Sequence, residues 1–321
     1  MRQKGIFTFF LIMPQQESLA HIADLWKAEK SLYVKKSTLA SYSYLLESHI
    51  LPALGGKTSV SEEDVQLLAN EKIAGGLSRK SVHDILIVLN MVLVYAGRNG
   101  YMEYSPMQIQ LPTKQKNDTV PTFTIEQQRI LSKYLKEHPS SESIGLQICL
   151  FSGLRIGEIC ALRWKNVDPV ENIIRIRQTI QRIYIYDDSG AKHTELVMDA
   201  PKSPDSIRDI PVPAELMLRL IPYKESAGDE AFVLSGKATP IEPRVYRTFY
   251  KRLLRRAGLP DVRFHALRHS FATRCIDSNC DYKTVSALLG HSNISTTLNL
   301  YVHPNMNQKR KVVEAMSAVL D

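Results

Sequence analysis

An arginine and a glutamate lie in an apolar segment of this sequence, where an ordinary surface ion pair is not expected. Arg155 stands three residues before Glu158, in a segment that is largely apolar from Leu146 to Leu162. At this spacing the two side chains share one helix face, and such a pair is usually a surface ion pair. The apolar setting favours another role, because a charge that is removed from water needs a partner or a function.

A second candidate segment is His265-Ala266-Leu267-Arg268-His269. Two histidines four residues apart on a helix are typical of zinc proteases. That pattern, however, requires a glutamate directly after the first histidine, and Ala266 occupies this position. We therefore expect no metal here. The simpler alternative is a helix that carries scattered polar residues.

A third segment contains Gly290-His291, and Tyr301 follows ten residues after the histidine. Gly290 is suited to end a helix, and Asn293 or Ser295 can cap the next one. Taken singly, His291 would be an ordinary loop histidine and Tyr301 an ordinary helix-end tyrosine. The order of the segments along the chain is more informative than any one of them.

This order resembles the signature of the tyrosine recombinases, also called the phage integrase family. The family signature runs arginine, then His-x-x-Arg, then Gly-His, and finally tyrosine. The matching residues here are Arg155, His265, Arg268, His291 and Tyr301. The spacing also fits, since 23 residues lead from Arg268 to His291 and 10 lead from there to Tyr301.

One more residue completes the resemblance. The segment 200–211 is similar to the β-hairpin of the family, and Lys202 stands where the family has its lysine. The resemblance extends over residues 18–310. It implies a site-specific recombinase, or integrase, of a mobile element that cleaves and religates DNA strands by way of a Holliday junction.

The residue types suit that reaction. Attack on a phosphodiester builds negative charge on oxygens that are already anionic, and two planar guanidinium groups can hold those oxygens bidentately. Arg155 and Arg268 would form this clamp. Tyr301 would attack and form a 3′-phosphotyrosyl bond. A tyrosine hydroxyl has a reference pKa of about 10, so it needs a base or a strongly cationic pocket at neutral pH.

The resemblance supplies the remaining roles. It implies His265 as the base, Lys202 as the acid that protonates the leaving 5′-oxygen, and His291 as a hydrogen-bond donor to the phosphate. Glu158 would orient the site. The phosphotyrosyl bond conserves the energy of the broken linkage, so we expect no ATP, no cofactor and no metal. The sequence contains no phosphate-binding loop of the G-x-x-x-x-G-K-[ST] type.

Double-stranded DNA is the expected partner, and no membrane is expected. The resemblance further implies a homotetramer on DNA and an accessory directionality factor. Residues 308–320 form a short amphipathic pattern, and the helix expected there packs either on its own domain or on a neighbouring subunit. Sequence alone does not separate these two arrangements.

Two other functions remain open at this level. A type IB topoisomerase-like enzyme shares the tyrosine chemistry but relaxes supercoils without exchanging partners. A non-enzymatic DNA-binding protein of the same fold is the second, although the full set of Arg, Lys, His and Tyr residues argues against it. The target DNA sequence and the direction of recombination are not encoded in any motif we identify.

The composition is ordinary for a soluble globular protein, and its positive charge makes anionic partners plausible, although many basic proteins bind no nucleic acid. The 321 residues carry a formal net charge of +8, with 44% hydrophobic and 23% charged residues, so wholesale disorder is excluded. The four cysteines form no C-x-x-C pair, which favours reduced thiols and a cytoplasmic location. The apolar run from Ile6 to Met13 is too short to span a membrane, and Met13 is an alternative start to Met1.

The segment 18–112 predicts a small all-α domain, the core-binding (SAM-like) domain of the resembled family. Four helices are expected, with Ser18, Ser37, Ser61 and either Ser78 or Ser81 at their starts. Residues 1–17 would be an N-terminal extension. The polar, proline-bounded stretch 113–122 is the predicted linker.

The segment 123–321 predicts a mainly α (α+β) catalytic domain with a small antiparallel sheet. Thr124 should cap a helix over 125–137, and a second helix is expected over 144–164. Alternating residues from Ile174 to Tyr186 predict a strand, with a returning paired strand at 194–199 and a third strand at 207–212. Helices are expected from Pro243 to the C-terminus.

A basic helix is expected over 243–258. Its arginines and lysine at 244, 247, 251 and 255 lie on one stripe, while aromatic and aliphatic residues line the opposite side. We interpret the stripe as a surface for DNA phosphates, with simple solvation as the alternative. Lys35-Lys36 and Arg79-Lys80 at two helix starts add to the basic surface.

Overall fold

The computed structural model describes residues 17–113, 122–186, 191–201 and 203–301, together with 310, 313, 314, 316 and 317. Its contacts divide the chain into two compact units. We call Met1–Lys116 with Ile183–Glu195 the helical unit, and Asn117–Arg182 with Leu196–Asp321 the C-terminal unit. Most residues of the predicted extension, linker and C-terminal helix lie outside the described residues.

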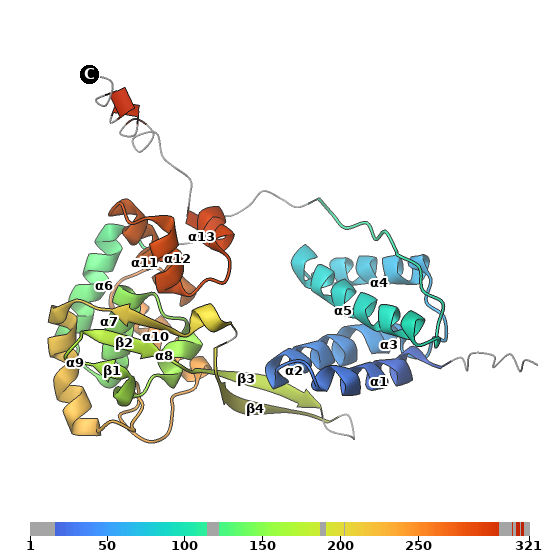
Figure 1. The fold of residues 1–321 in the computed structure, drawn as a ribbon, viewed down its shortest axis with the longest axis horizontal. Coiled ribbons are helices and arrows are strands. Elements are labelled where there is room, and N and C mark those ends of the chain that lie inside the picture. The colour runs from blue at the N-terminus through green and yellow to red at the C-terminus, as the bar shows by residue number, and fades with distance from the viewer. Residues whose placement is uncertain are drawn as a thin grey trace, which may run out of the picture. The chain divides into compact units, whose positions relative to one another are not determined.

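Helices make up the first part of the helical unit, coloured blue to cyan in Figure 1. They are α1 (Leu19–Ser31), α2 (Lys36–Leu45), the π-helical turn η1 (Leu46–Ile50), α3 (Leu51–Leu54), α4 (Glu62–Ala74) and α5 (Arg79–Arg98). Ser18 and Ser78 cap α1 and α5, and Ser61 forms a capping box with Asp64 at the start of α4. These three predicted starts are confirmed.

The second predicted start, Ser37, lies one residue after the first residue of α2 and two residues after its N-cap. Helix α2 begins at Lys36, and Lys35 holds the N-cap position without a side-chain hydrogen bond. Ser37 therefore lies inside the first turn. The helix then continues through the π-helical turn to Leu54, so the chain stays helical from α2 to α3.

The core of the helical unit forms around Trp26, Leu46, Ile85 and Leu89, each of which is buried. Helix α5 supplies the longest buried stripe of this core. By length and composition α5 could also cross a membrane. Its buried residues pack within the helical core, which accounts for the same apolar composition.

Helices also dominate the C-terminal unit. They are α6 (Ile125–Glu137), α7 (Ser141–Ser152), α8 (Ile156–Ala161), α9 (Ala214–Ala227), α10 (Pro243–Arg256), α11 (His265–Asp277), α12 (Tyr282–Leu289) and α13 (Ile294–Tyr301). Thr124 caps α6 as predicted. The single helix predicted over 144–164 is wrong, because Gly153 ends α7 in the left-handed conformation and α8 starts afresh. Helix α9 was not predicted.

The strands form two small antiparallel sheets. One contains β1 (Val167–Asp168), β2 (Ile173–Ile176) and β5 (Arg208–Pro211) in the order β1-β2-β5. The other is the pair of β3 (Thr179–Tyr186) and β4 (Lys192–Asp199). The one strand predicted from 174 to 186 is therefore two strands, in different sheets. The hairpin expected over 200–211 is also wrong, because β5 pairs with β2 and not with β4.

The distal half of the β3–β4 hairpin belongs to the helical unit. The ring of Tyr184 stacks on Tyr44 of α2 with centroids 5.7 Å apart, and the Lys192 ammonium lies 4.1 Å from the Tyr184 centroid. Lys36 and Glu195 form an ion pair of 2.7 Å. Aromatic stacking, a cation–π contact and an ion pair thus hold the end of this hairpin on α2.

Close packing in the C-terminal unit gives a first prediction. A Cβ added at Gly145 on α7 would clash with the Leu234 side chain and lie 2.6 Å from the Tyr246 hydroxyl. Gly145→Ala should lower the free energy of unfolding of this unit by about 1–3 kcal/mol, because the core has no room for the methyl group. Urea unfolding followed by Trp164 fluorescence in a Trp26→Phe background measures the change.

Gly56→Ala is the matched control, since no atom lies within 4 Å of a Cβ built at Gly56. It should leave the Trp164 transition unchanged. An equally stable Gly145→Ala protein would show that α7 can move away from Tyr246 at no cost.

Candidate active site

The first arginine of the site is placed by a break between two helices. Gly153 has a φ of 62°, and a Cβ there would lie 2.6 Å from the Phe271 ring, so both backbone and space require glycine. Arg155 is then the N-cap residue of α8. It does not share a helix face with Glu158 as the spacing predicted.

Arg155 nevertheless pairs with Glu158. Its backbone N–H donates to Oε2 of Glu158 at 2.9 Å, and its guanidinium Nη1 donates to Oε1 at 2.8 Å. The Glu158 side chain is only 2% exposed, whereas that of Arg155 is 35% exposed. The carboxylate therefore anchors one side of the guanidinium group and leaves part of it open to solvent.

The second arginine, Arg268, lies on α11 and is 1% exposed. Its Nη1 donates to the carbonyl oxygen of Gly153 at 3.0 Å, and its Nη2 donates to that of Leu289 at 2.7 Å. Arg155 donates to the same Leu289 oxygen at 3.4 Å and to the Gly290 oxygen at 3.1 Å. The two guanidinium groups thus converge on the end of α12.

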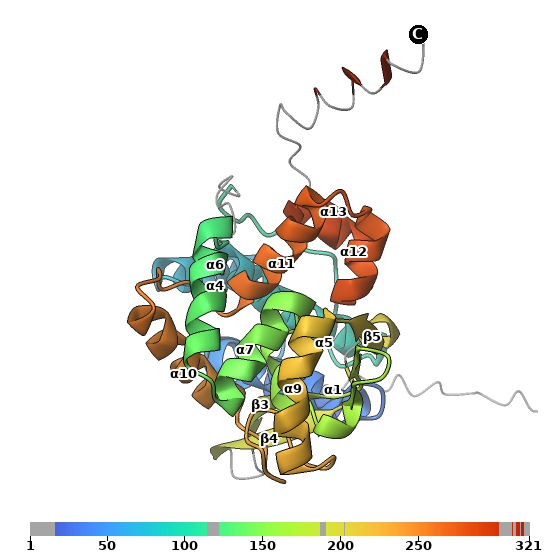
Figure 2. The same ribbon diagram turned by 90° about the vertical axis from the view of Figure 1, so that its left-hand side faces the viewer.

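The end of α12 suits these cations for two reasons. The last carbonyl groups of a helix lack intrahelical partners and carry the negative end of the helix dipole. Gly290 also turns the chain with a φ of 65°, and a Cβ there would lie 2.9 Å from the Asp205 oxygen. Glycine is therefore required at the residue that leads into His291. Figure 2 shows α11, α12 and α13 grouped at one end of the C-terminal unit.

Three histidines surround the arginines. His265 begins α11 with its side chain exposed, and its ring meets the buried His269 ring edge to face, with centroids 4.5 Å apart. Partial removal from water, followed by His269 and the charges of Arg268 and Arg155, lowers the pKa of His265 to about 4. The imidazole is therefore neutral at pH 7 and able to accept a proton.

His291 follows Gly290 in the turn between α12 and α13. Its Nδ1 lies 2.8 Å from Oγ1 of Thr297. Partial removal from water, with Arg268 and Arg155 as the next causes, lowers its pKa to about 4. Loss of water contact and the Arg268 charge lower the pKa of His269 to about 4 as well. All three imidazoles are neutral at pH 7.

Glu158 behaves as a carboxylate in spite of its burial. Burial alone would raise its pKa, but hydrogen bonds and charge from Arg208, and then the charge of Arg155, hold the pKa below its ordinary value. Arg208 reaches it from β5 with two parallel hydrogen bonds of 3.1 and 3.0 Å. Glu158 is thus an ionised group between two arginines.

The structure brings together four of the six predicted site residues: Arg155, His265, Arg268 and His291. Tyr301 ends α13, which packs on α11 and α12, but its side chain lies outside what is described. Lys202 also lies outside the described residues. Its chain neighbours Pro201 and Ser203 lie between the end of β4 and the start of β5.

Sequence reasoning missed Arg208 and gave His269 no role. A signal for Arg208 was present, because period-two alternation over 207–212 puts residues 208 and 210 on the same face. Ile210 is fully buried, so an arginine on its face must be paired. For His269 the signal was its spacing of one helical turn from His265.

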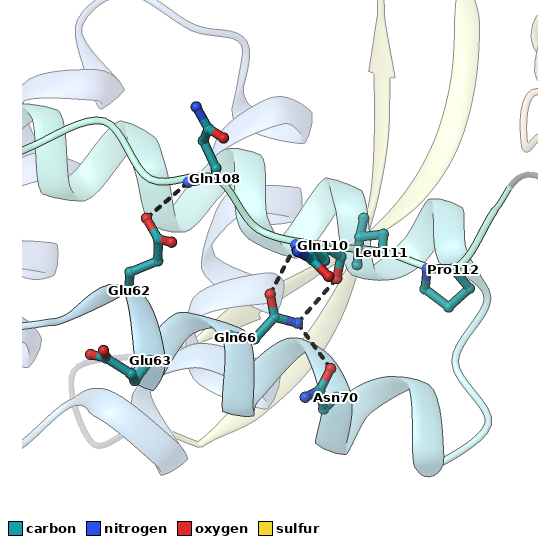
Figure 3. Close-up of a pocket in the computed structure, with 8 residues that line it drawn as sticks. All are labelled: Glu62, Glu63, Gln66, Asn70, Gln108, Gln110, Leu111 and Pro112. Atoms are coloured by element: carbon teal, nitrogen blue, oxygen red, sulfur yellow. Dashed lines mark hydrogen bonds between the residues drawn. The ribbon is translucent and has the colours of Figure 1, made fainter.

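A cleft of about 670 Å³ lies elsewhere, in the helical unit, between α4 and the segment 108–112. Figure 3 shows Gln66 holding this segment: its amide donates to the Gln110 carbonyl at 3.1 Å and accepts from the Gln110 N–H at 2.8 Å. Glu62 and Glu63 also line the cleft. Two carboxylates make it a poor place for phosphate, so we assign it a structural role.

The basic helix over 243–258 is present as α10. Its buried side chains include Tyr246, Tyr250 and Leu254, and all six of its arginines and lysines are exposed: Arg244, Arg247, Lys251, Arg252, Arg255 and Arg256. Val245, predicted on the apolar side, is 56% exposed. The charged face is thus open to a partner, as the DNA interpretation requires.

Metal ligands are not gathered in the described part of the chain, where no group of three or more His, Cys, Asp or Glu side chains could hold an ion. Cys149, Cys160, Cys275 and Cys280 are all free thiols. Burial raises the pKa of Cys149 well above its ordinary value, which makes this thiol inert.

Comparison with known families gives two matches. Residues 122–308 match the phage integrase family, and residues 18–60 match the N-terminal SAM-like domain of phage integrases. The first match alone covers more than half of the chain.

Relatives and solved structures agree with these matches. The chain is 30% identical over 286 residues to a XerC-like tyrosine recombinase of Caldanaerobacter subterraneus subsp. tengcongensis, covering 82% of this chain and 72% of the relative. The fold is similar to the Tn1549 transposon integrase in complex with transposon right end DNA, with a TM-score of 0.75, 23% identity and coverage of 94% and 100%.

A more distant likeness joins the chain to a lambda integrase tetramer bound to a Holliday junction. The TM-score is 0.63 at 16% identity, covering 91% of this chain and 80% of the other. These likenesses confirm the predicted fold class, a SAM-like helical domain followed by a mainly helical domain with small antiparallel sheets.

The depressed pKa values of the three histidines give a prediction for the free protein. His265, His269 and His291 stay neutral in the folded state down to a pH of about 4, whereas an unfolded histidine titrates near 6.5. Between these values the unfolded chain binds more protons, so the free energy of unfolding should fall as the pH drops from 6.5 towards 4.

NMR checks this at each residue. The Cε1–H resonances of the three imidazoles, assigned with His265→Gln, His269→Gln and His291→Gln, should not shift between pH 7.5 and 5.5. A resonance that titrates with a midpoint near 6.5 would contradict the lowered pKa of that imidazole.

Proposed function

Because this chain belongs to the phage integrase family of tyrosine recombinases, we propose that it cleaves DNA through a covalent 3′-phosphate bond to Tyr301. The chain is a site-specific DNA recombinase, an enzyme that breaks and rejoins DNA strands. One observation carries the assignment of its site. The guanidinium groups of Arg155 and Arg268 donate to one carbonyl oxygen, that of Leu289, so their donors point at a common place.

The arginine pair supplies the electrostatic part of the reaction. In the cleavage step the Tyr301 oxygen forms a bond to phosphorus, and the bond from phosphorus to the 5′-oxygen breaks. Charge on the non-bridging oxygens is greatest midway, where guanidinium donors stabilise it most. The exposed part of Arg155 is the portion available to the phosphate.

Proton transfer completes the step. His265 is neutral in the free protein, so it can take the Tyr301 proton as the attack proceeds. Lys202 gives a proton to the leaving 5′-oxygen. Religation is the reverse: a 5′-hydroxyl attacks the phosphotyrosyl bond, and Tyr301 leaves. The energy of the linkage is conserved throughout.

His291 serves the phosphate directly in this proposal. Its Nδ1 faces the Thr297 hydroxyl, which leaves Nε2 available to a non-bridging oxygen. A neutral imidazole with its proton on Nε2 donates one hydrogen bond and adds no charge of its own.

We further propose a homotetramer on double-stranded DNA that passes through a Holliday junction. The lambda integrase to which this fold is similar forms a tetramer on a Holliday junction. The exposed arginines of α10 would contact phosphates of the DNA duplex, and the helix expected over 308–320 would pack on its own unit or a neighbouring subunit. An accessory directionality factor and a cytoplasmic location complete the proposal.

The likeness to the Tn1549 transposon integrase supports a role in a mobile element. Integration or excision of such an element would exchange DNA strands between two recombination sites. Formation of a recombinant product, and not only relaxation of supercoils, separates this function from that of a topoisomerase.

Replacement of the nucleophile gives the central prediction. Tyr301→Phe should bind DNA as the wild type does but form no covalent adduct, because the variant lacks only the attacking oxygen. The measurement is mass spectrometry of protein trapped on a nicked suicide substrate, built from the DNA that flanks the gene. Tyr282→Phe on α12, which is exposed at the surface, is the control and should still form the adduct. Adduct on a different residue in Tyr301→Phe would remove the assignment.

Loss of either arginine should slow cleavage. Arg155→Ala should reduce the rate of adduct formation by roughly 10²–10³-fold, as loss of one transition-state donor typically does. Arg268 is buried, so Arg268→Lys is the variant that keeps its charge while it loses the planar fork. Gel-shift assays should show DNA binding within a few-fold of wild type.

Arg219→Ala on α9 is the control for a general loss of surface charge, since Arg219 pairs with Glu215 of the same helix. It should cleave at the wild-type rate. Near-normal cleavage by Arg155→Ala would exclude this residue from the phosphate site.

A further inference from the structure

Arg208 on β5 is a buried arginine that the reaction described above does not use. Its side chain is 6% exposed. Nη1 and Nη2 each donate to one oxygen of Glu158, at 3.1 and 3.0 Å. Nε donates to the Leu288 carbonyl oxygen at 2.7 Å, and Nη1 also donates to that of Ser206 at 3.0 Å. The hydrogen bonds of Arg208 therefore all go to acceptors within the protein.

Glu158 is the group that Arg208 shares with Arg155. Oε1 of Glu158 accepts from both guanidinium groups, at 2.8 Å from Arg155 and 3.1 Å from Arg208. One negative charge thus lies between two positive charges, and the three groups together carry one net positive charge. Without Arg208, Glu158 would pair with Arg155 alone, and the net charge beside the phosphate would be zero.

We propose that Arg208 is a positioning residue of the phosphate site: it engages Glu158 so that Arg155 keeps its positive charge for the scissile phosphate. The inference rests on the proposed function of Arg155. The contrast in exposure fits these separate tasks, since the Arg155 side chain is 35% exposed and that of Arg208 only 6%. One arginine faces solvent, where DNA can reach it, and the other faces the carboxylate.

Arg208 also joins three segments of the site. It lies six residues after Lys202 in the chain, holds the Leu288 carbonyl at the end of α12, and packs against Gly290. A Cβ at Gly290 would lie 3.1 Å from its Cδ and Nη1 atoms. The residue before His291 is therefore seated directly on the Arg208 side chain. A change at Arg208 can therefore affect Arg155 by way of Glu158. It can also affect His291 by way of Gly290.

The test separates charge from structure by a double substitution. Arg208→Gln removes the charge but keeps a hydrogen-bond donor, and it should slow adduct formation on the suicide substrate at least about tenfold. Groups one contact away from a metal ligand typically have effects of that size, and we take the same scale here. Adding Glu158→Gln restores one net positive charge, so the Glu158→Gln/Arg208→Gln protein should cleave faster than Arg208→Gln alone. Trp164 fluorescence and DNA binding establish that each protein is folded.

A neutral substrate provides a readout that a purely structural role would not move. In a methylphosphonate at the scissile position a methyl group replaces one non-bridging oxygen, so the phosphorus group is neutral before attack and its transition state carries one negative charge fewer for Arg155 to hold. The deficit of Arg208→Gln relative to wild type should be much smaller on this substrate than on the phosphodiester. Arg208→Lys, which keeps the charge, should be less impaired than Arg208→Gln on the phosphodiester.

The control is Arg175→Gln on β2 of the same sheet, where Arg175 pairs with Asp168. It should cleave at the wild-type rate. An equal deficit of Arg208→Gln on both substrates, or no gain from Glu158→Gln, would overturn the charge role of Arg208. Failure of wild-type protein to form any adduct would instead overturn the proposed function, and the inference with it.

Discussion

A single buried carboxylate, that of Glu158, is the constraint on which the rest of the site depends. A charge with 2% exposure must be neutralised, and here the neutralising groups come from two different elements, the start of α8 and strand β5. Because Glu158 also caps the α8 backbone through the Arg155 N–H, one side chain fixes the helix start, the strand and the orientation of the solvent-facing arginine. Truncation of this side chain would remove every acceptor oxygen that these contacts use, whereas replacement by glutamine would keep one of them.

Helix ends do most of the positioning. Gly153 ends α7 and Gly290 ends α12, and both adopt positive φ angles with no room for a Cβ. Their carbonyl groups, with that of Leu289, accept hydrogen bonds from Arg155 and Arg268. The guanidinium groups are therefore oriented before any phosphate arrives, and a phosphate oxygen would replace a partial negative charge with a full one. Such prior orientation lowers the reorganisation needed during the reaction.

Much of this architecture was predictable, and the failures have a common physical cause. The starts of α1, α4, α5 and α6 follow from capping residues close in sequence, which act locally. The pairing of β2 with β5 depends on residues more than 30 positions apart, and alternation along one strand does not name its partner. The same holds for Arg208, whose partners Glu158 and Leu288 lie 50 and 80 positions away.

The pairing of β2 with β5 has a consequence for how such a chain can change. Ile176 and Arg208 are partners in the register, so the residues between them form an excursion that leaves the sheet and returns to the same place. Doubling the length of such a loop costs only about 0.6 kcal/mol in closure entropy, so insertions there are tolerated. The β3–β4 hairpin lies in this excursion, and so does Lys202. Substitutions and insertions between Ile176 and Arg208 can thus change the contacts of the hairpin and the position of Lys202. The positions of Arg155 and Arg268 do not depend on this segment.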